Sequence, residues 1–296
     1  MNQFDYIAAT SIEQAVEVMS EHGSDASILA GGTDLLISLR RLNGNGPKMI
    51  VDISHIKVLQ GIWLENGIVN LSPLVTHTMV EHSRVIQQQS SLLSYAASVI
   101  GSPQIRNRGT VVGNIMNAAA CADTVPPLVA LGASVTLQSK NGIRKLPLPD
   151  LFVEPYRTNA KPDEVLTKIQ FPALPQKAKS SFIKLGRRNA LAISRLSVAA
   201  IVCQNAKGII VDARIVPGAT FPTWQRIREA EQLLVGEQPS RKLFESAGKK
   251  VSEMMIAKIG RRWSTEYKEP VIAVLVRRAL EQCIDRPIDL RGSAAS

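Results

Sequence analysis

The stretch Leu29-Ala30-Gly31-Gly32-Thr33-Asp34-Leu35 connects a short apolar strand, predicted at residues 27–30, with a helix predicted at residues 35–40. Two consecutive glycines let the backbone approach an anion closely, and the amides that follow them can donate hydrogen bonds to it. The alternative is an ordinary tight turn in which Asp34 caps the helix. The chain has neither G-x-G-x-x-G nor G-x-x-x-x-G-K-[ST], so a nucleotide bound here would require another type of fold.

A second glycine-bearing stretch reads Gly-Ser-Pro-Gln-Ile-Arg-Asn at residues 101–107 and Gly-Thr-Val-Val-Gly-Asn-Ile at residues 109–115. We interpret it as a loop that could supply further phosphate and ribose contacts. Alternatively, Arg106 and Asn107 only bond loop carbonyls, and the glycines only form turns. Two loops of this kind in one domain, with no catalytic histidine, favour binding of a cofactor over acid–base chemistry by the chain itself.

A third feature lies in the last part of the chain, where Lys184 ends a predicted strand ahead of Arg187 and Arg188. A lysine in this position could face an electron-rich ring or a phosphate. The alternative is a solvated basic surface.

Helix and strand patterns alternate through the first half. Ser11 and Gln14 form a capping box for a helix at residues 12–22, and strands are expected at residues 27–30 and 49–53. The pairs Asn66-Gly67 and Asn141-Gly142 predict hairpins. Prolines at 172 and 175 punctuate the chain, so we divide it into residues 1–175, with subdomains 1–56 and 57–175, residues 176–288, and a disordered tail at 289–296.

The last third begins with strands and ends with helices. Strands are predicted at residues 181–185, 196–204 and 208–217, and helices at residues 226–234, 243–259 and 271–284. Strands followed by helices indicate an α+β unit, a sheet with helices on one face.

Composition excludes several classes of protein. The 296 residues are 45% hydrophobic and 20% charged, which is typical of folded domains rather than of disorder. Three distant cysteines form neither a disulfide framework nor a metal site. There is no secretion signal, no membrane span and no G-x-S-x-G motif, and the four histidines are scattered. We expect a cytoplasmic protein with no catalytic nucleophile and no metal ligands of its own.

The net charge of +10 is distributed unevenly. Residues 1–176 carry 13 basic and 14 acidic side chains, and residues 177–296 carry 22 and 11. A nucleic-acid partner is disfavoured, because no recognised binding motif is present and aromatic residues are few. Two interpretations of the basic excess remain: a docking face for a protein, or simply a solvated surface.

Taken together, Ala30-Gly31-Gly32-Thr33-Asp34, Gln104-Ile105-Arg106-Asn107, Gly113-Asn114 and the stretch from Lys184 to Ser194 resemble the FAD-binding medium subunit of the molybdenum hydroxylases. This is the family of xanthine, carbon monoxide and nicotinate dehydrogenases, and the resemblance runs from Phe4 to about residue 285. It implies a two-subdomain FAD-binding domain of the vanillyl-alcohol oxidase/PCMH type. A C-terminal α+β domain with a three-stranded antiparallel sheet and helices would follow.

The resemblance also implies the residues that bind FAD. The first loop would hold the pyrophosphate, and the second would complete the diphosphate and ribose contacts. Asp123 would lie by the ribose. Val165 or Leu166, together with Lys184, would lie by the adenine or flavin ring. The implied cofactor-binding residues are Ser27, Ile28, Leu29, Ala30, Gly31, Gly32, Thr33, Asp34, Gly109, Thr110, Val111, Val112, Gly113, Asn114, Asp123, Val165, Leu166 and Lys184.

Val112 departs from the family pattern, which has glycine there, and a Cβ at this position restricts backbone approach. The [4Fe–4S] insertion of the 4-hydroxybenzoyl-CoA reductase branch is missing.

The implied function is an electron-transfer subunit. It would accept electrons from the [2Fe–2S] clusters of a small partner and pass them to an external acceptor such as NAD, while a large molybdopterin partner oxidises the substrate. Two alternatives are a stand-alone FAD oxidoreductase of the vanillyl-alcohol oxidase type and a flavin-free assembly subunit.

Overall fold

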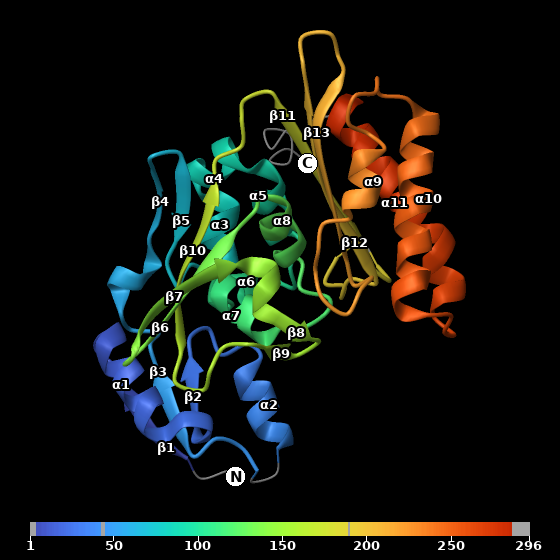
Figure 1. The fold of residues 1–296 in the computed structure, drawn as a ribbon. Helices are drawn as coiled ribbons and strands as arrows, with labels where there is room; N and C mark the ends of the chain where they lie inside the picture. Colours follow the sequence, from blue (N-terminus) through green and yellow to red (C-terminus); the bar gives the residue numbers. More distant parts are fainter. Residues whose placement is uncertain (1–3, 43–44, 189, 286–296) are drawn as a thin grey trace.

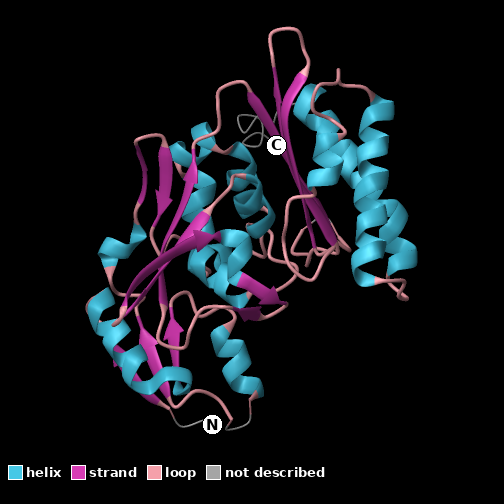
Figure 2. Ribbon diagram, viewed as in Figure 1, coloured by secondary structure: helices cyan, strands magenta, loops and turns pink. Residues whose placement is uncertain are grey.

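The computed structural model describes residues 4–42, 45–188 and 190–285, and the tail predicted at 289–296 lies outside them. Three sheets follow one another through the molecule, each covered by helices (Figures 1 and 2). A short two-stranded ribbon, β8 (Phe152–Glu154) with β9 (Arg157–Thr158), lies between the second and third. No helix in these described ranges has the length and apolar character needed to cross a membrane.

The first sheet is parallel and has the strand order β1-β3-β2. Its elements are β1 (Asp5–Ala8), α1 (Ile12–His22), η1 (Gly23–Asp25), β2 (Ala26–Leu29), α2 (Leu35–Arg41) and β3 (Met49–Asp52). The predicted cap of α1 is confirmed, because the Ser11 hydroxyl accepts from the Gln14 amide at 3.2 Å. The Gln14 side chain reaches back to the Thr10 amide rather than to Ser11. The apolar face of α1 packs on this sheet, and the loop of interest leaves from the end of β2.

The second sheet has the order β4-β5-β10-β6-β7 and is antiparallel throughout. Its strands are β4 (Ile62–Glu65), β5 (Ile68–Leu71), β6 (Ser134–Ser139), β7 (Gly142–Pro147) and β10 (Val165–Pro172). Both predicted hairpins are confirmed. Asn66 and Gly67 adopt φ of 49° and 74°, as a tight turn between right-twisted strands requires.

Short helices follow the first hairpin and share the large apolar core with this sheet. They are α3 (His77–His82), α4 (Arg84–Gln89), α5 (Ser91–Ser98), α6 (Pro103–Arg108), α7 (Val111–Asn117) and α8 (Val125–Ala130). The single turn η2 (Lys57–Gln60) precedes the hairpin, and η3 (Leu148–Leu151) follows β7. Each of α3, α4, α6 and α7 begins at a Ser or Thr whose hydroxyl accepts a backbone amide. Side-chain caps therefore set where these helices begin.

The third sheet is antiparallel, with the order β11-β12-β13. Its strands and the helices that follow are β11 (Ala178–Leu185), β12 (Leu196–Gln204), β13 (Ile210–Gly218), α9 (Arg228–Gln232), α10 (Arg241–Ile259) and α11 (Thr265–Asp285). Along β12, Val198 and Ala200 pack under the C-terminal helices, whereas Ala199 and Ile201 join the core of the second sheet. Both faces are covered, not only one as the sequence indicated, because α5 and α8 pack on the second face.

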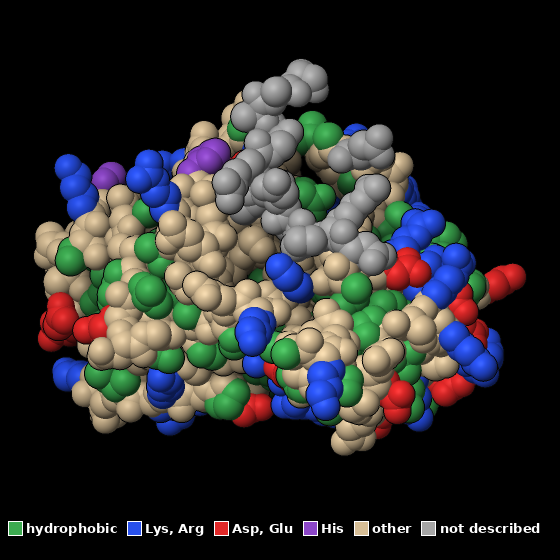
Figure 3. Space-filling view, turned by 90° about the horizontal axis from the view of Figure 1, so that it is seen from above, with side chains coloured by type: hydrophobic (Ala, Val, Ile, Leu, Met, Phe, Trp, Pro, Cys, Tyr) green, Lys and Arg blue, Asp and Glu red, His purple; other side chains and the backbone are tan. Residues whose placement is uncertain are grey.

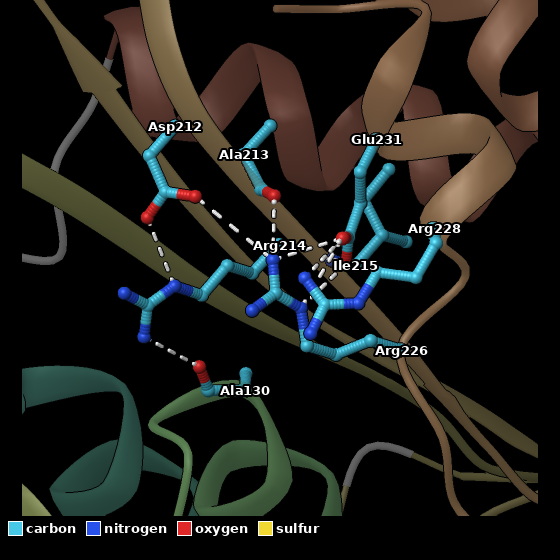
Figure 4. A network of polar contacts seen from close by, with 8 residues as sticks. All are labelled: Ala130, Asp212, Ala213, Arg214, Ile215, Arg226, Arg228 and Glu231. Carbon is cyan, nitrogen blue, oxygen red and sulfur yellow. Dashed lines mark hydrogen bonds and ion pairs between the residues drawn. The ribbon is translucent and has the colours of Figure 1, made fainter.

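Polar bonds accompany this apolar contact. Arg214 on β13 donates to the Ala130 carbonyl at the end of α8 (3.0 Å) and to the Asp212 carboxylate (3.0 Å). Beside it, Arg226 donates to both carboxylate oxygens of Glu231, and the Glu231 Oε1 also accepts the Ile215 amide (Figure 4). The network connects β13 with α9 on one side and α8 on the other.

Candidate functional site

A cavity of about 570 Å³ lies where the loop after β2 meets α7 and the segment at residues 158–166. This volume falls within the roughly 300–1,000 Å³ of small-molecule and cofactor sites. Predicted binding residues that line it are Ser27, Ile28, Ala30, Gly31, Gly32, Thr33, Asp34, Thr110, Val112, Gly113, Asn114, Val165 and Leu166. Predicted binding residues that do not line it are Leu29, Gly109, Val111, Asp123 and Lys184.

The first loop presents unpaired donors to the cavity. Within the described residues, the backbone amides of Gly31, Gly32, Thr33 and Asp34 donate no hydrogen bond. Gly31, Gly32 and Thr33 are half-buried and Asp34 is exposed. Half-buried amides are nearly always paired, so this unpaired run along a cavity wall indicates a place for an external acceptor. Gly32 has a φ of 74°, which turns the chain from β2 into α2.

Gly31 is required by a contact between two segments. A Cβ at this position would lie 2.0 Å from the Arg108 carbonyl oxygen and 3.0 Å from the Gly109 Cα. The first loop therefore touches the chain between α6 and α7 backbone to backbone. Asn117 on α7 adds a bond of 3.2 Å to the Asp34 carboxylate, which also accepts from the Thr33 hydroxyl. The two glycine-bearing stretches form one wall.

The second stretch is not the loop that we expected, because α7 begins at Val111. The Thr110 hydroxyl accepts from the Gly113 amide at 2.9 Å and starts the helix. Val112 is a helical residue, buried in the main core as well as lining the cavity, and its φ is not positive. Its Cβ therefore strains no backbone. Asn114 accepts from the Thr124 hydroxyl at 2.8 Å, which fixes its amide.

Residues 103–108 are likewise helical, as α6, and their polar side chains have internal partners. Arg106 donates to the Glu81 carboxylate (3.0 Å) and to the Ile100 carbonyl (3.1 Å), and Asn107 accepts from the Thr78 hydroxyl (2.6 Å). Neither Arg106 nor Asn107 lines the cavity, so the structural alternative describes them better than the ligand-binding one.

Asp123 and Lys184 bond to each other across the junction of the second and third sheets. The Lys184 ammonium donates to the Asp123 carboxylate at 2.7 Å and to the Val99 carbonyl at 2.8 Å. The Ser194 hydroxyl donates to the second Asp123 oxygen. Burial raises the pKa of Asp123, against the opposing effect of Lys184 and Ser194. Paired in this way, the two residues join the two parts of the chain.

Sequence reasoning missed several residues of the wall. His77, Ile100, Ile105, Asn117, Thr158, Ala160 and Lys161 all line the cavity. Residues 158–161 come just before β10, and no short-range pattern places them opposite residues 27–34. Only the pairing of β10 with β5 and β6 brings them there.

Like Glu164, His77 is a buried titratable group of this wall. Burial, with a smaller effect of the Arg106 charge, lowers its pKa to about 4. Its Nδ1 has no hydrogen-bond partner among the described residues. The imidazole is therefore neutral near pH 7, and its backbone amide donates to the Gly109 carbonyl at 3.1 Å.

Two family models match the chain: the FAD binding domain in molybdopterin dehydrogenase over residues 2–174, and the CO dehydrogenase flavoprotein C-terminal domain over residues 181–283. The chain belongs to the molybdopterin dehydrogenase FAD-binding family. It is thus a component of an oxidoreductase complex, and the FAD-binding domain is on this chain.

Members of this family are similar over nearly their whole length. The 6-hydroxypseudooxynicotine dehydrogenase complex subunit alpha of Paenarthrobacter nicotinovorans is 32% identical over 96% of this chain and 95% of its own. The xanthine dehydrogenase FAD-binding subunit of Escherichia coli is 29% identical over 94% and 95%. A structure of carbon monoxide dehydrogenase from Hydrogenophaga pseudoflava superposes with a TM-score of 0.89 at 27% identity, covering 97% of this chain and 99% of that one.

The cavity suits the cofactor of this family. Its wall offers the four unpaired amides for a diphosphate and, in Val112, Val165 and Leu166, apolar surface for a ring. The glycine contact at Gly31 leaves no side chain between the loop and α6.

Proposed function

We propose that this chain holds FAD and carries electrons within a molybdopterin-dependent hydroxylase or dehydrogenase. Electrons would come from [2Fe–2S] clusters of a small partner subunit and leave to an external acceptor, while a large molybdopterin subunit oxidises the substrate. The observation that carries the proposal is the run of unpaired amides from Gly31 to Asp34 at a cavity of cofactor size. Membership in the family supports it.

The chain's own residues would bind FAD and orient it. The amides of the first loop would hold the diphosphate, and Thr110, Gly113 and Asn114 would complete that wall. Val165 and Leu166 would exclude water on the opposite wall of the cavity. Asp123 and Lys184 would bear on the cofactor from the junction of the second and third sheets, where they form an ion pair. When bound, FAD supplies a carrier that stores two electrons and exchanges them singly or as hydride.

We assign the finer architecture on the same basis. The first two sheets form a FAD-binding domain of the vanillyl-alcohol oxidase/PCMH type at residues 1–175, divided near residue 56, and the third sheet forms the domain at residues 176–288. The separate cores of the first and third sheets support this division. The three cysteines are free, in keeping with a cytoplasmic location.

A flavin titration of the purified chain tests the site. Gly32→Ala is the informative variant and Gly132→Ala its matched control, because both glycines have nearly the same φ, 74° and 73°, and only Gly32 lines the cavity. Each change should cost about 1 kcal/mol of stability through backbone strain. Gly32→Ala should cost somewhat more, because its Cβ would lie 3.1 Å from the Leu29 side chain and 3.2 Å from that of Leu36, whereas a Cβ at Gly132 meets nothing within 4 Å. Only Gly32→Ala should weaken FAD binding, by about tenfold. Absence of FAD binding by the unmodified chain would reject the proposal in favour of a flavin-free assembly subunit.

Co-purification with partner subunits tests the complex. A native complex should contain molybdenum and iron as well as flavin. A lone chain that oxidises a substrate by itself would instead support a stand-alone oxidoreductase of the vanillyl-alcohol oxidase type.

The charge pattern of the third sheet and its helices indicates where a partner subunit would bind. Basic and acidic side chains are interspersed where α10 and α11 lie (Figure 3), and pairs such as Arg241–Glu245 neutralise some of these basic side chains. The loop between β11 and β12 differs, because Leu191 and Ile193 are exposed beside Arg187 and Arg195. Arginine next to exposed apolar side chains is typical of interfaces. Arg187→Glu with Arg195→Glu should weaken assembly, Arg241→Glu should not, and unchanged assembly of the double variant would reject this surface.

A further inference from the structure

One side chain supplies the positive charge of the cavity wall. Among the described residues that line the cavity, Lys161 is the only lysine or arginine, whereas Asp34 and Glu164 are acidic. Glu164 is paired with Arg144, but the Lys161 ammonium has no acidic partner within 4 Å in the described part of the chain. The unpaired amides of the first loop carry only partial charges, so a dianionic diphosphate would be incompletely neutralised by them alone.

Lys161 lies in a turn whose backbone is held by bonds within it. The Lys161 amide donates to the Glu164 carboxylate at 2.7 Å, and the Glu164 amide donates to the Lys161 carbonyl at 3.0 Å. At the start of the turn, the Asn159 amide donates to the Leu151 carbonyl at 2.8 Å, and the Asn159 side chain donates to the Asp150 carbonyl. The turn is fixed at both ends.

Arg144 on β7 joins these two ends. Its guanidinium donates to both Glu164 oxygens, at 2.6 and 2.8 Å, and to the Asn159 carbonyl at 3.0 Å. Glu164 is buried, and its hydrogen bonds from Arg144 lower its pKa despite the burial. Arg144 does not line the cavity. It lies behind the wall and determines where the Lys161 backbone is placed.

We propose that Lys161 is the side-chain cation that pairs with the phosphates of FAD, and that the Arg144–Glu164 pair is its positioning device. This inference rests on the proposed function, because it takes the anion in the cavity to be the diphosphate of a flavin dinucleotide. Lys161 contributes charge directly to the bound anion. Arg144 contributes to FAD binding only by holding the turn that places Lys161.

The salt dependence of FAD binding tests Lys161. Lys161→Met should raise the dissociation constant for FAD about fivefold at low salt. The difference should shrink as NaCl is added, because ions screen the lost interaction. Lys145→Met is the matched control, an exposed lysine on β7 that does not line the cavity, and it should change neither quantity.

A thermodynamic cycle tests Arg144. Arg144→Gln should weaken FAD binding, and most of that loss should disappear when Lys161 is already methionine, since Arg144 acts through Lys161. Arg144→Lys keeps the charge and one bond, so it should fold and bind with an intermediate dissociation constant. Arg157→Gln removes a neighbouring arginine whose ion pair is exposed, and it should leave FAD binding unchanged.

The outcomes separate the two proposals. If the unmodified chain binds no FAD, the proposed function fails. If it binds FAD and Lys161→Met has the same affinity and salt dependence, this inference alone is overturned. If the effects of Lys161→Met and Arg144→Gln simply add, Lys161 stands and the positioning role of Arg144 is rejected.

Discussion

Two polar junctions hold the third sheet against the helices of the second, and they use the same device. At one, Lys184 of β11 donates to the Val99 carbonyl that ends α5; at the other, Arg214 of β13 donates to the Ala130 carbonyl that ends α8. In both, a cation meets the negative end of a helix. In both, a carboxylate balances the cation, Asp123 in the first and Asp212 in the second.

The two junctions differ in burial. The side chains of Lys184 and Asp123 are 12% and 6% exposed, whereas those of Arg214 and Asp212 are 22% and 43% exposed. Water can solvate Asp212 when its partner is removed, but it cannot reach Asp123 without opening the structure. Ion pairs of similar length, 2.7 and 3.0 Å, therefore do not imply equal dependence on the partner, because desolvation decides what an unpaired charge costs.

Lys184→Met should have the largest effect. It leaves the Asp123 carboxylate buried and without its cation, which should lower the free energy of unfolding by about 3–5 kcal/mol. Adding Asp123→Asn should restore much of that loss, since no charge then remains buried. Urea unfolding of the flavin-free chain measures both variants. Losses that add in the double variant would show that the two residues do not act as a pair.

His77 differs from both junctions, because it is a buried titratable group with no ionic partner. Its pKa of about 4 lies below the 6.5 of a free imidazole, so the unfolded chain binds more protons between these pH values. Stability contributed by neutral His77 is complete above pH 6.5 and is lost as the pH falls to 4, by about 3 kcal/mol. His77→Gln should remove this part of the acid sensitivity in unfolding curves, and His82→Gln, at an exposed histidine, should not. An unchanged pH profile for His77→Gln would contradict the assignment.

Arg214→Met should cost less than Lys184→Met. The Ala130 carbonyl loses its charged donor, but Asp212 remains solvated, so a loss of about 1–2 kcal/mol is expected. Thermal and urea unfolding measure it on the same chain. A loss as large as that of Lys184→Met would mean that burial does not distinguish the two junctions.

Arg241→Met should give the smallest loss in the free energy of unfolding among these substitutions. Its partner Glu245 lies four residues away on α10, and both side chains are largely exposed, at 72% and 52%. Water screens such an exposed pair, so it contributes little to stability. The expected change is at the resolution of urea unfolding, and a loss above that of Arg214→Met would invert the proposed order.

Local signals in the sequence predicted much of the fold. The cap at Ser11 and the turn at Asn66-Gly67 act within a few residues, and the structure has both. The predicted loop at residues 109–115 is wrong, because the Thr110 hydroxyl starts a helix there and the glycines favour a loop in the sequence pattern.

The candidate site was only partly predictable for a similar reason. The unpaired amides at residues 31–34 follow from local glycine chemistry. The bonds of Lys184 to Asp123 and of Arg144 to Glu164 span 61 and 20 residues. The first forms because the third sheet packs on α5 and α8, and the second because β7 and β10 both pair with β6. No spacing rule indicates that two residues singled out for a ligand will also bond to each other.

The doubly covered third sheet has a consequence for biosynthesis. Until the ribosome has released β11 to β13, the outer surfaces of α5 and α8 have nothing to pack against, and Phe152 lacks the ring of Trp224, 4.5 Å away. The nascent N-terminal half therefore exposes an aggregation-prone apolar surface for the time needed to translate the rest of the chain. Expression of residues 1–175 alone should give inclusion bodies, and chaperones should engage the unfinished chain on that surface.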